Sequence, residues 1–226
     1  MYMRAILKII PLSGLLICSV QQTIHAQELI PFPFISEEKN KLLDENDTVK
    51  IYAVRQDTSL AISINEDMMF ARVVSRHNTR RVLAEGYVAE NSDSYIQHGR
   101  WTAYYAPGKP RIKGSYIKGM PAGTWEEYHN NGRLKDSYHY GIFSDKDGTY
   151  TCMTGEYRSY TPNGKLQITG FYMAERTRTS DTLIVEDPVT GDSVHKKLYR
   201  SVLTAHKTGT WTWYDEEGII EKTQEY

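Results

Sequence analysis

The chain has 226 residues, a length that suits one large domain or two small ones. It is 40% hydrophobic and 24% charged with a formal net charge of −1, so it has no basic excess to attract nucleic acid or anionic lipid. Its 17 Tyr and 4 Trp against 5 Phe favour sheets with one wetted face, because Tyr and Trp join a large apolar body to a polar tip.

Residues 1–26 have the pattern of a secretory signal peptide. Arg4 and Lys8 make a positive start, and the apolar stretch from Ile9 to Val20 follows. Ala26 supplies the small residue required before a cleavage point. The apolar stretch is too short to span a bilayer, which takes roughly 20 residues. We therefore expect export to an extracytoplasmic location: the periplasm, the outer membrane or the medium.

Cys18 leaves a second outcome of export open. The segment from Leu15 to Cys18 resembles a bacterial lipoprotein box, although Ile17 stands where such a box has a small residue. We expect contact with a membrane only if Cys18 is lipidated. After cleavage at Ala26, Cys152 is the only cysteine, so no internal disulfide is expected and a buried apolar role is predicted for it.

Residues 27–88 are expected to form a short N-terminal cap of mixed α/β structure. The Pro-rich stretch 30–34 is predicted to lie extended along the surface. Residues 36–45 are predicted to form a short helix that begins at a serine cap. A strand is expected over residues 49–54, and residues 70–88 have the spacing of a degenerate capping unit.

Residues 89–226 are expected to form a repeat domain. Four segments share one spacing: Gly, an aromatic residue two positions on, Tyr three further, a second Gly four further, and Tyr eight beyond that. The copies are Gly99, Trp101, Tyr104, Gly108, Tyr116; Gly123, Trp125, Tyr128, Gly132, Tyr140; Gly155, Tyr157, Tyr160, Gly164, Tyr172; and Gly209, Trp211, Tyr214, Gly218, Tyr226. Five positions held in register over four copies indicate one repeated structural unit.

Each copy has the pattern of a β-hairpin. The second Gly ends turn sequences such as Asn130-Asn131-Gly132, because Gly and Asn tolerate the positive φ of tight hairpin turns. The residues after the turn alternate between apolar and polar, which is the period of a strand. Trp125 and Tyr128 are three apart, which leaves two arrangements open. A bulge near the first Gly could bring both rings to one face, or the rings pack separately, one in the core and one against a neighbouring repeat.

Two insertions interrupt the repeats. Residues 141–154 are predicted to form a turn with a short strand, and residues 174–206 an extra hairpin that projects from the array. The predicted fold is therefore mainly β, with repeated antiparallel hairpins forming an elongated single-layer sheet.

The second copy, which reads GTWEEYHNNGRL from Gly123 to Leu134, resembles the MORN-repeat variant of many bacterial proteins. The segment from Gly209 to Gly218 is a second close match, and the third copy departs by having Tyr157 in the Trp position. The resemblance implies hairpin repeats and a scaffolding role rather than a reaction. Some proteins with these repeats are antitoxins, so an antitoxin or immunity-type protein that neutralises a toxin is the alternative.

The sequence has no motif of a catalytic site, a cofactor site or a metal site. We therefore expect no enzyme activity, no cofactor and no metal. The motif aromatics are predicted to form the repeat core. Trp213 and Tyr105 are additional to the motif, so they are the predicted surface contacts. The function predicted from sequence is an exported binding or scaffolding protein that contacts another protein or a cell-envelope glycan.

Overall fold

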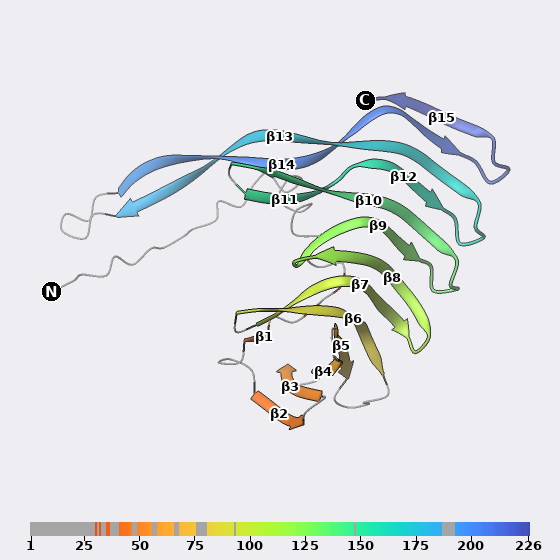
Figure 1. Cartoon of the computed structure of the whole chain (residues 1–226). Coiled ribbons are helices and arrows are strands. Elements are labelled where there is room, and N and C mark those ends of the chain that lie inside the picture. Colours follow the sequence, from red (N-terminus) through yellow and green to blue (C-terminus); the bar gives the residue numbers. More distant parts are fainter. Residues whose placement is uncertain are drawn as a thin grey trace.

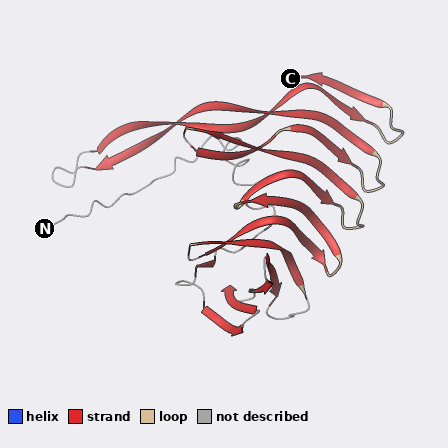
Figure 2. Ribbon diagram, viewed as in Figure 1, coloured by secondary structure: helices blue, strands red, loops and turns tan. Residues whose placement is uncertain are grey.

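The computed structural model describes residues 30, 32, 35–36, 41–46, 49–55, 58–65, 68–75, 81–92, 94–146, 148–186 and 193–226. The predicted signal peptide and Cys18 lie outside this part of the chain. All regular elements in the described part are strands, as Figure 2 shows. Among these residues, no helix has the length and apolar character needed to cross a membrane.

The strands follow one another closely along the chain. They are β1 (Ile35–Ser36), β2 (Lys41–Asn46), β3 (Val49–Arg55), β4 (Thr58–Asn65), β5 (Met68–Ser75), β6 (Val82–Asn91), β7 (Ser94–Ala106), β8 (Lys109–Ile117), β9 (Met120–Tyr128), β10 (Leu134–Asp145), β11 (Gly148–Met153), β12 (Gly155–Tyr160), β13 (Leu166–Glu186), β14 (Ser193–Tyr214) and β15 (Ile220–Glu225).

These strands form a single antiparallel sheet. From β2 to β15 each strand pairs with the next one along the chain, with one exception. β11 and β12 do not pair with each other: both pair with β10, β12 near the start of β10 and β11 along its end. The strands lie in order as a curved array that ends at β15 (Figure 1). The predicted elongated sheet of antiparallel hairpins is therefore confirmed.

Three copies share one turn geometry. The amide of Gly132 donates to the carbonyl of His129, and the amide of His129 donates to the carbonyl of Arg133, both at 2.8 Å. The same pair of bonds recurs around Gly164 and Gly218. Gly132 has a φ of 85°, the left-handed conformation that closes a three-residue hairpin loop.

The helix predicted over residues 36–45 is wrong. The described ends of that segment are β1 and β2, and β2 pairs with β3 from Lys41 opposite Ala53 to Asn46 opposite Val49. An isolated helix of about ten residues is marginal in water. A sheet edge that offers a row of backbone partners therefore outweighs the capping signal, and the described residues of the cap are β rather than α/β.

Both insertions continue the strands of the repeats. β10 runs on to Asp145 and returns as β11, which covers the predicted short strand. β13 and β14 pair without a break in pairing from Ala174 opposite Ala205 to Glu186 opposite Ser193. The second insertion thus lengthens the two strands that connect the third copy to the fourth, and it extends beyond the other strands in Figure 1.

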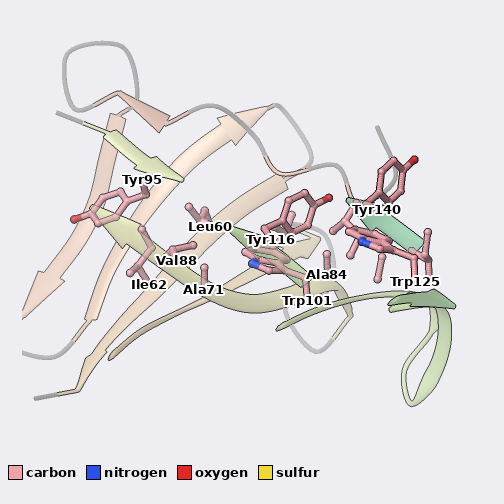
Figure 3. Packing of buried hydrophobic residues seen from close by; sticks show 14 of the residues in the cluster. Leu60, Ile62, Ala71, Ala84, Val88, Tyr95, Trp101, Tyr116, Trp125 and Tyr140 are labelled. Atoms are coloured by element: carbon pink, nitrogen blue, oxygen red, sulfur yellow. The ribbon is translucent and has the colours of Figure 1, made fainter. Parts of the chain in front are cut away.

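The main core lies under the first half of the sheet. Side chains of β3 to β6 and of the first two copies form one buried layer, in which Trp101 and Trp125 are the largest fully buried side chains (Figure 3). Ile30 is fully buried, its carbonyl accepts a bond from the Gln97 amide, and Phe32 packs edge-on against Trp101. The prediction that stretch 30–34 lies along the surface is therefore wrong for Ile30. We call Ile30 and Phe32 the N-terminal strap.

Candidate binding face

The two aromatic positions of the motif lie on opposite faces of the sheet. We call the face that carries Trp101, Trp125 and Trp211 the core face, and the other the outer face. The Tyr104 hydroxyl donates to Glu85 at 2.7 Å, and Glu85 pairs with Thr102, the neighbour of Trp101. The sequence left two arrangements open, and the structure shows the second: the two rings of the motif pack separately, one on each face.

Each tryptophan of the motif lies flat on a glycine of the preceding strand. A Cβ added to Gly114 would come within 2.2 Å of the Trp125 ring, and one added to Gly170 within 2.2 Å of the Trp211 ring. Gly86 has the same relation to Trp101, with 2.4 Å. The missing side chain makes room for the indole, so the tryptophans interlock neighbouring repeats.

The third copy shows why its Trp position holds Tyr157. Asp136 pairs with Ser159 and Ser137 with Arg158, so Tyr138 comes next to Tyr157 in the same register. Tyr138 occupies the position at which the first and third copies present a glycine, Gly114 and Gly170. An indole lying flat on the backbone has no space there, and a smaller ring takes its place.

The side chains on the core face change along the array, from apolar in the first half to charged and aromatic in the second. One row of paired residues crosses it and is apolar in the first half: Tyr52, Leu60, Val73, Ala84, Ala103 and Ile112. The row then continues through Glu127, Asp136 and Ser159 to Ile168 and Trp213. The N-terminal strap packs on the first half, whereas in the second half the rings at Tyr157, Tyr172 and Trp213 are only half-buried.

Five rings form a continuous surface on this second half, which we call the aromatic face: Tyr157, Tyr172, Trp211, Trp213 and Tyr226. Trp211 is at the centre, stacked on Tyr157 at 5.6 Å and edge-on to Tyr172 at 5.1 Å between ring centroids. Trp213 and Tyr226 lie 6.3 and 6.1 Å from it. Trp211 is buried by these rings, while Tyr226 stays 50% exposed.

Two lysines lie over the rings at the β15 end. The Lys207 ammonium is 4.2 Å from the centroid of Trp211 and 4.9 Å from that of Tyr226. The Lys222 ammonium is 4.9 Å from the Trp213 centroid. Such cation–π contacts favour positive charge on the face, because the ring faces carry partial negative charge.

A carboxylate pair lies beside the aromatic face. The Tyr157 hydroxyl donates to Asp136 at 2.8 Å, and the Tyr138 hydroxyl donates to Glu127 at 2.9 Å. Lys135 contacts both carboxylates, at 3.0 and 3.5 Å. Burial alone would lower the pKa of Lys135, but the hydrogen bond and charge of Asp136 raise it above its usual value. Burial and the nearby carboxylates raise the pKa of both tyrosines.

Trp213 and Tyr105, the residues predicted to make surface contacts, lie in different surroundings. Trp213 belongs to the aromatic face. Tyr105 is 39% exposed, and its hydroxyl donates to the carbonyl of Tyr128 at 3.0 Å. The corresponding residue of the second copy, His129, contacts the carbonyl of Tyr160 at 2.8 Å. Tyr105 thus links two repeats, and the structure does not bring it together with Trp213.

The described residues offer no group of metal ligands, since no three His, Cys, Asp or Glu side chains gather in them. Cys152 is buried, as predicted, and burial raises the pKa of its thiol to about 11. The thiol is therefore protonated at neutral pH and a poor nucleophile. The chemistry of the aromatic face is that of stacking, charge pairing and hydrogen bonding.

Sequence comparison identifies the repeat. The pattern of the MORN repeat variant matches residues 97–118, 153–173 and 207–226. These segments contain the first, third and fourth copies, and the second copy has the same hairpin geometry. Comparison with curated proteins and with solved structures yields no match. Repeats of this kind commonly act as binding or scaffolding modules. The chain therefore contains repeats of the MORN variant.

Proposed function

We propose that this protein is an exported, non-enzymatic binding module of the cell envelope, which holds a partner protein or a glycan on its aromatic face. The signal-like N-terminus supports export, and the repeat family supports binding rather than catalysis. The observation that carries the proposal is the change in side-chain type along the core face. Its apolar half is packed under the N-terminal strap, and its aromatic and charged half presents half-buried rings.

Trp213 is the side chain that most directly tests this proposal. It lies beside Trp211 but contributes nothing to the five-position motif, so its replacement by alanine leaves the repeat core in place. Phe171, 51% exposed and of opposite parity to Tyr172 on β13, is a matched aromatic control on the outer face. Rings at the centre of an interface commonly contribute more than 1 kcal/mol to binding.

The experiment combines cell fractionation with crosslinking in intact cells. We expect the protein in the envelope or the medium, crosslinked to a partner that Trp213→Ala loses and Phe171→Ala retains. Recovery of the unprocessed protein in the cytoplasm would contradict export. Equal crosslinking of both variants would contradict the assignment of the site to the aromatic face.

A further inference from the structure

We infer that the ligand of the aromatic face is an acidic glycan, a chain of sugars that carry carboxylate or another anionic group. This inference rests on the proposed function and specifies its ligand. It starts from two positions at which the last copy departs from the others.

The first position lies two residues before the first Gly of each copy, where Gln97, Pro121, Met153 and Lys207 stand. In the earlier copies the residue is uncharged, and Pro121 is fully buried. Lys207 pairs with Tyr172 in the row that also contains the final tyrosines of the copies. An ammonium has therefore taken a place in the ring layer that other copies fill with uncharged groups.

The second position lies four residues after the turn Gly, where Ile112, Asp136, Ile168 and Lys222 stand. Ile112 is buried in the core. In the last copy Lys222 pairs with Trp213 and lies over its ring. Both departures thus bring a positive charge to the same end of the aromatic face.

Neither lysine is neutralised by the described part of the chain. The described contacts of Lys207 are the three rings of Trp211, Trp213 and Tyr226 and the Tyr226 hydroxyl at 3.4 Å. The described residues include no carboxylate within ion-pair distance of either ammonium. On β15, Glu225 accepts a bond from Thr210 on the outer-face side. Within the part of the chain that the structure describes, the aromatic face therefore presents two cations without a counter-ion.

The ligand has to match rings, cations and carboxylates on one surface. The C–H faces of a sugar ring stack on Trp213 and Tyr226, and an acidic group on the sugar pairs with Lys207 and Lys222. Sugar hydroxyls donate to the carboxylates of Glu127 and Asp136 at the other end of the face. An acidic peptide or an anionic lipid surface offers the same negative charge but no series of flat C–H faces to stack on the rings, which favours the glycan.

The rings also lie on successive strands, so the surface extends across the sheet. Tyr157 is on β12, Tyr172 on β13, Trp211 and Trp213 on β14, and Tyr226 follows β15. Neighbouring strands are about 4.8 Å apart. A linear chain lying across the strands meets one ring after another, whereas a single sugar covers only part of the face.

The test measures binding of the exported protein to polygalacturonate, with a neutral dextran and poly-L-glutamate as comparison ligands, by isothermal titration calorimetry. We expect binding to polygalacturonate that weakens as salt is added, because ion pairs at an open surface are screened. Lys207→Gln and Lys222→Gln each weaken it about tenfold, and Lys207→Arg restores it. Lys113→Gln, which removes an ammonium 4.9 Å over the Tyr128 ring on the outer face, leaves it unchanged.

Other outcomes overturn the inference. Absence of binding to polygalacturonate, or unchanged binding by both lysine variants, would show that the lysines do not recognise an acidic sugar. Equal binding of poly-L-glutamate would indicate an acidic protein partner instead. If Trp213→Ala abolishes capture of an envelope partner while polygalacturonate does not bind, the binding face stands and only the glycan is wrong. Circular dichroism of each variant separates loss of binding from loss of fold.

Discussion

Replacing Gly114 with alanine tests the interlock between repeats, because it adds a single carbon under a buried indole. The new Cβ would lie 2.2 to 2.5 Å from three atoms of the Trp125 ring, where ordinary contacts are 3.4 to 4 Å. Trp125 is fully buried between Tyr116 and Tyr140, at 5.1 and 6.0 Å between ring centroids. The ring therefore has to move by about 1 Å against packed neighbours.

The magnitude follows from two opposing effects. Overpacking of this kind costs about 1–3 kcal/mol. Alanine also restricts the unfolded chain relative to glycine, which offsets the cost by about 0.4–1 kcal/mol. We expect Gly114→Ala to lower the free energy of unfolding by about 1–2 kcal/mol in urea titrations followed by circular dichroism and tryptophan fluorescence.

A double variant separates this cause from a general effect of alanine. Trp125→Leu removes the indole, so Gly114→Ala should cost little in that background, and the two changes should couple by about 1 kcal/mol or more. Gly123→Ala is the matched control, since it meets no atom within 4 Å and is penalised only by its φ of 71°. Its cost should stay the same with or without the indole. A Gly114→Ala protein as stable as its parent, or strict additivity with Trp125→Leu, would refute the interlock.

Three further predictions concern the turn, the alkaline limit and the strap. Gly132→Val should lower the free energy of unfolding by about 1–2 kcal/mol and Gly132→Asn by less, because only the φ of 85° opposes the side chain; equal urea midpoints would contradict this. Burial, followed by Glu85 for Tyr104 and Glu126 for Tyr128, raises the pKa of these tyrosines from 10.0 to about 12. Their folded pKa exceeds the unfolded value, so their contribution to stability is present below pH 10 and lost as pH rises to 12; tyrosinate absorbance should appear together with unfolding. Phe32→Ala should cost about 2 kcal/mol by removing the contact with Trp101, measured by thermal unfolding; an unchanged midpoint would show that the strap contributes no stability.

The repeat was predictable because its constraints are local. A turn glycine such as Gly132 requires positive φ, and alternation after the turn marks a strand, so hairpins follow from neighbouring residues. The faces were harder to predict. Trp125 and Tyr128 lie on opposite faces, and the sequence left this open because a bulge at the first Gly could have reversed one of them.

The N-terminal region shows where local reasoning fails. Residues 36–45 have a good helix start, yet β2 forms because β3 offers it a partner strand. Ile30 lies in a Pro-rich stretch with neither a helical nor a strand period, so the local sequence does not say what it packs against; its partner Gln97 is 67 residues away. Among the residues of the aromatic face, Trp213 could be predicted as a contact residue from the sequence, because it is additional to the five-position motif. Lys207 could have been found in the same way, by comparing the residues two positions before each first Gly.

The contact between tryptophan and glycine has a consequence for how such an array can grow or be rearranged. Each indole depends on a glycine carried by the unit before it, so the compatible module runs from the returning strand of one hairpin to the outgoing strand of the next. A duplication cut at the hairpin turns keeps Gly114 and Trp125 together, whereas one cut between hairpins can place an indole against a side chain such as Tyr138. Recombination of these genes should therefore succeed mainly at the turns, and designers of longer arrays should join their pieces there.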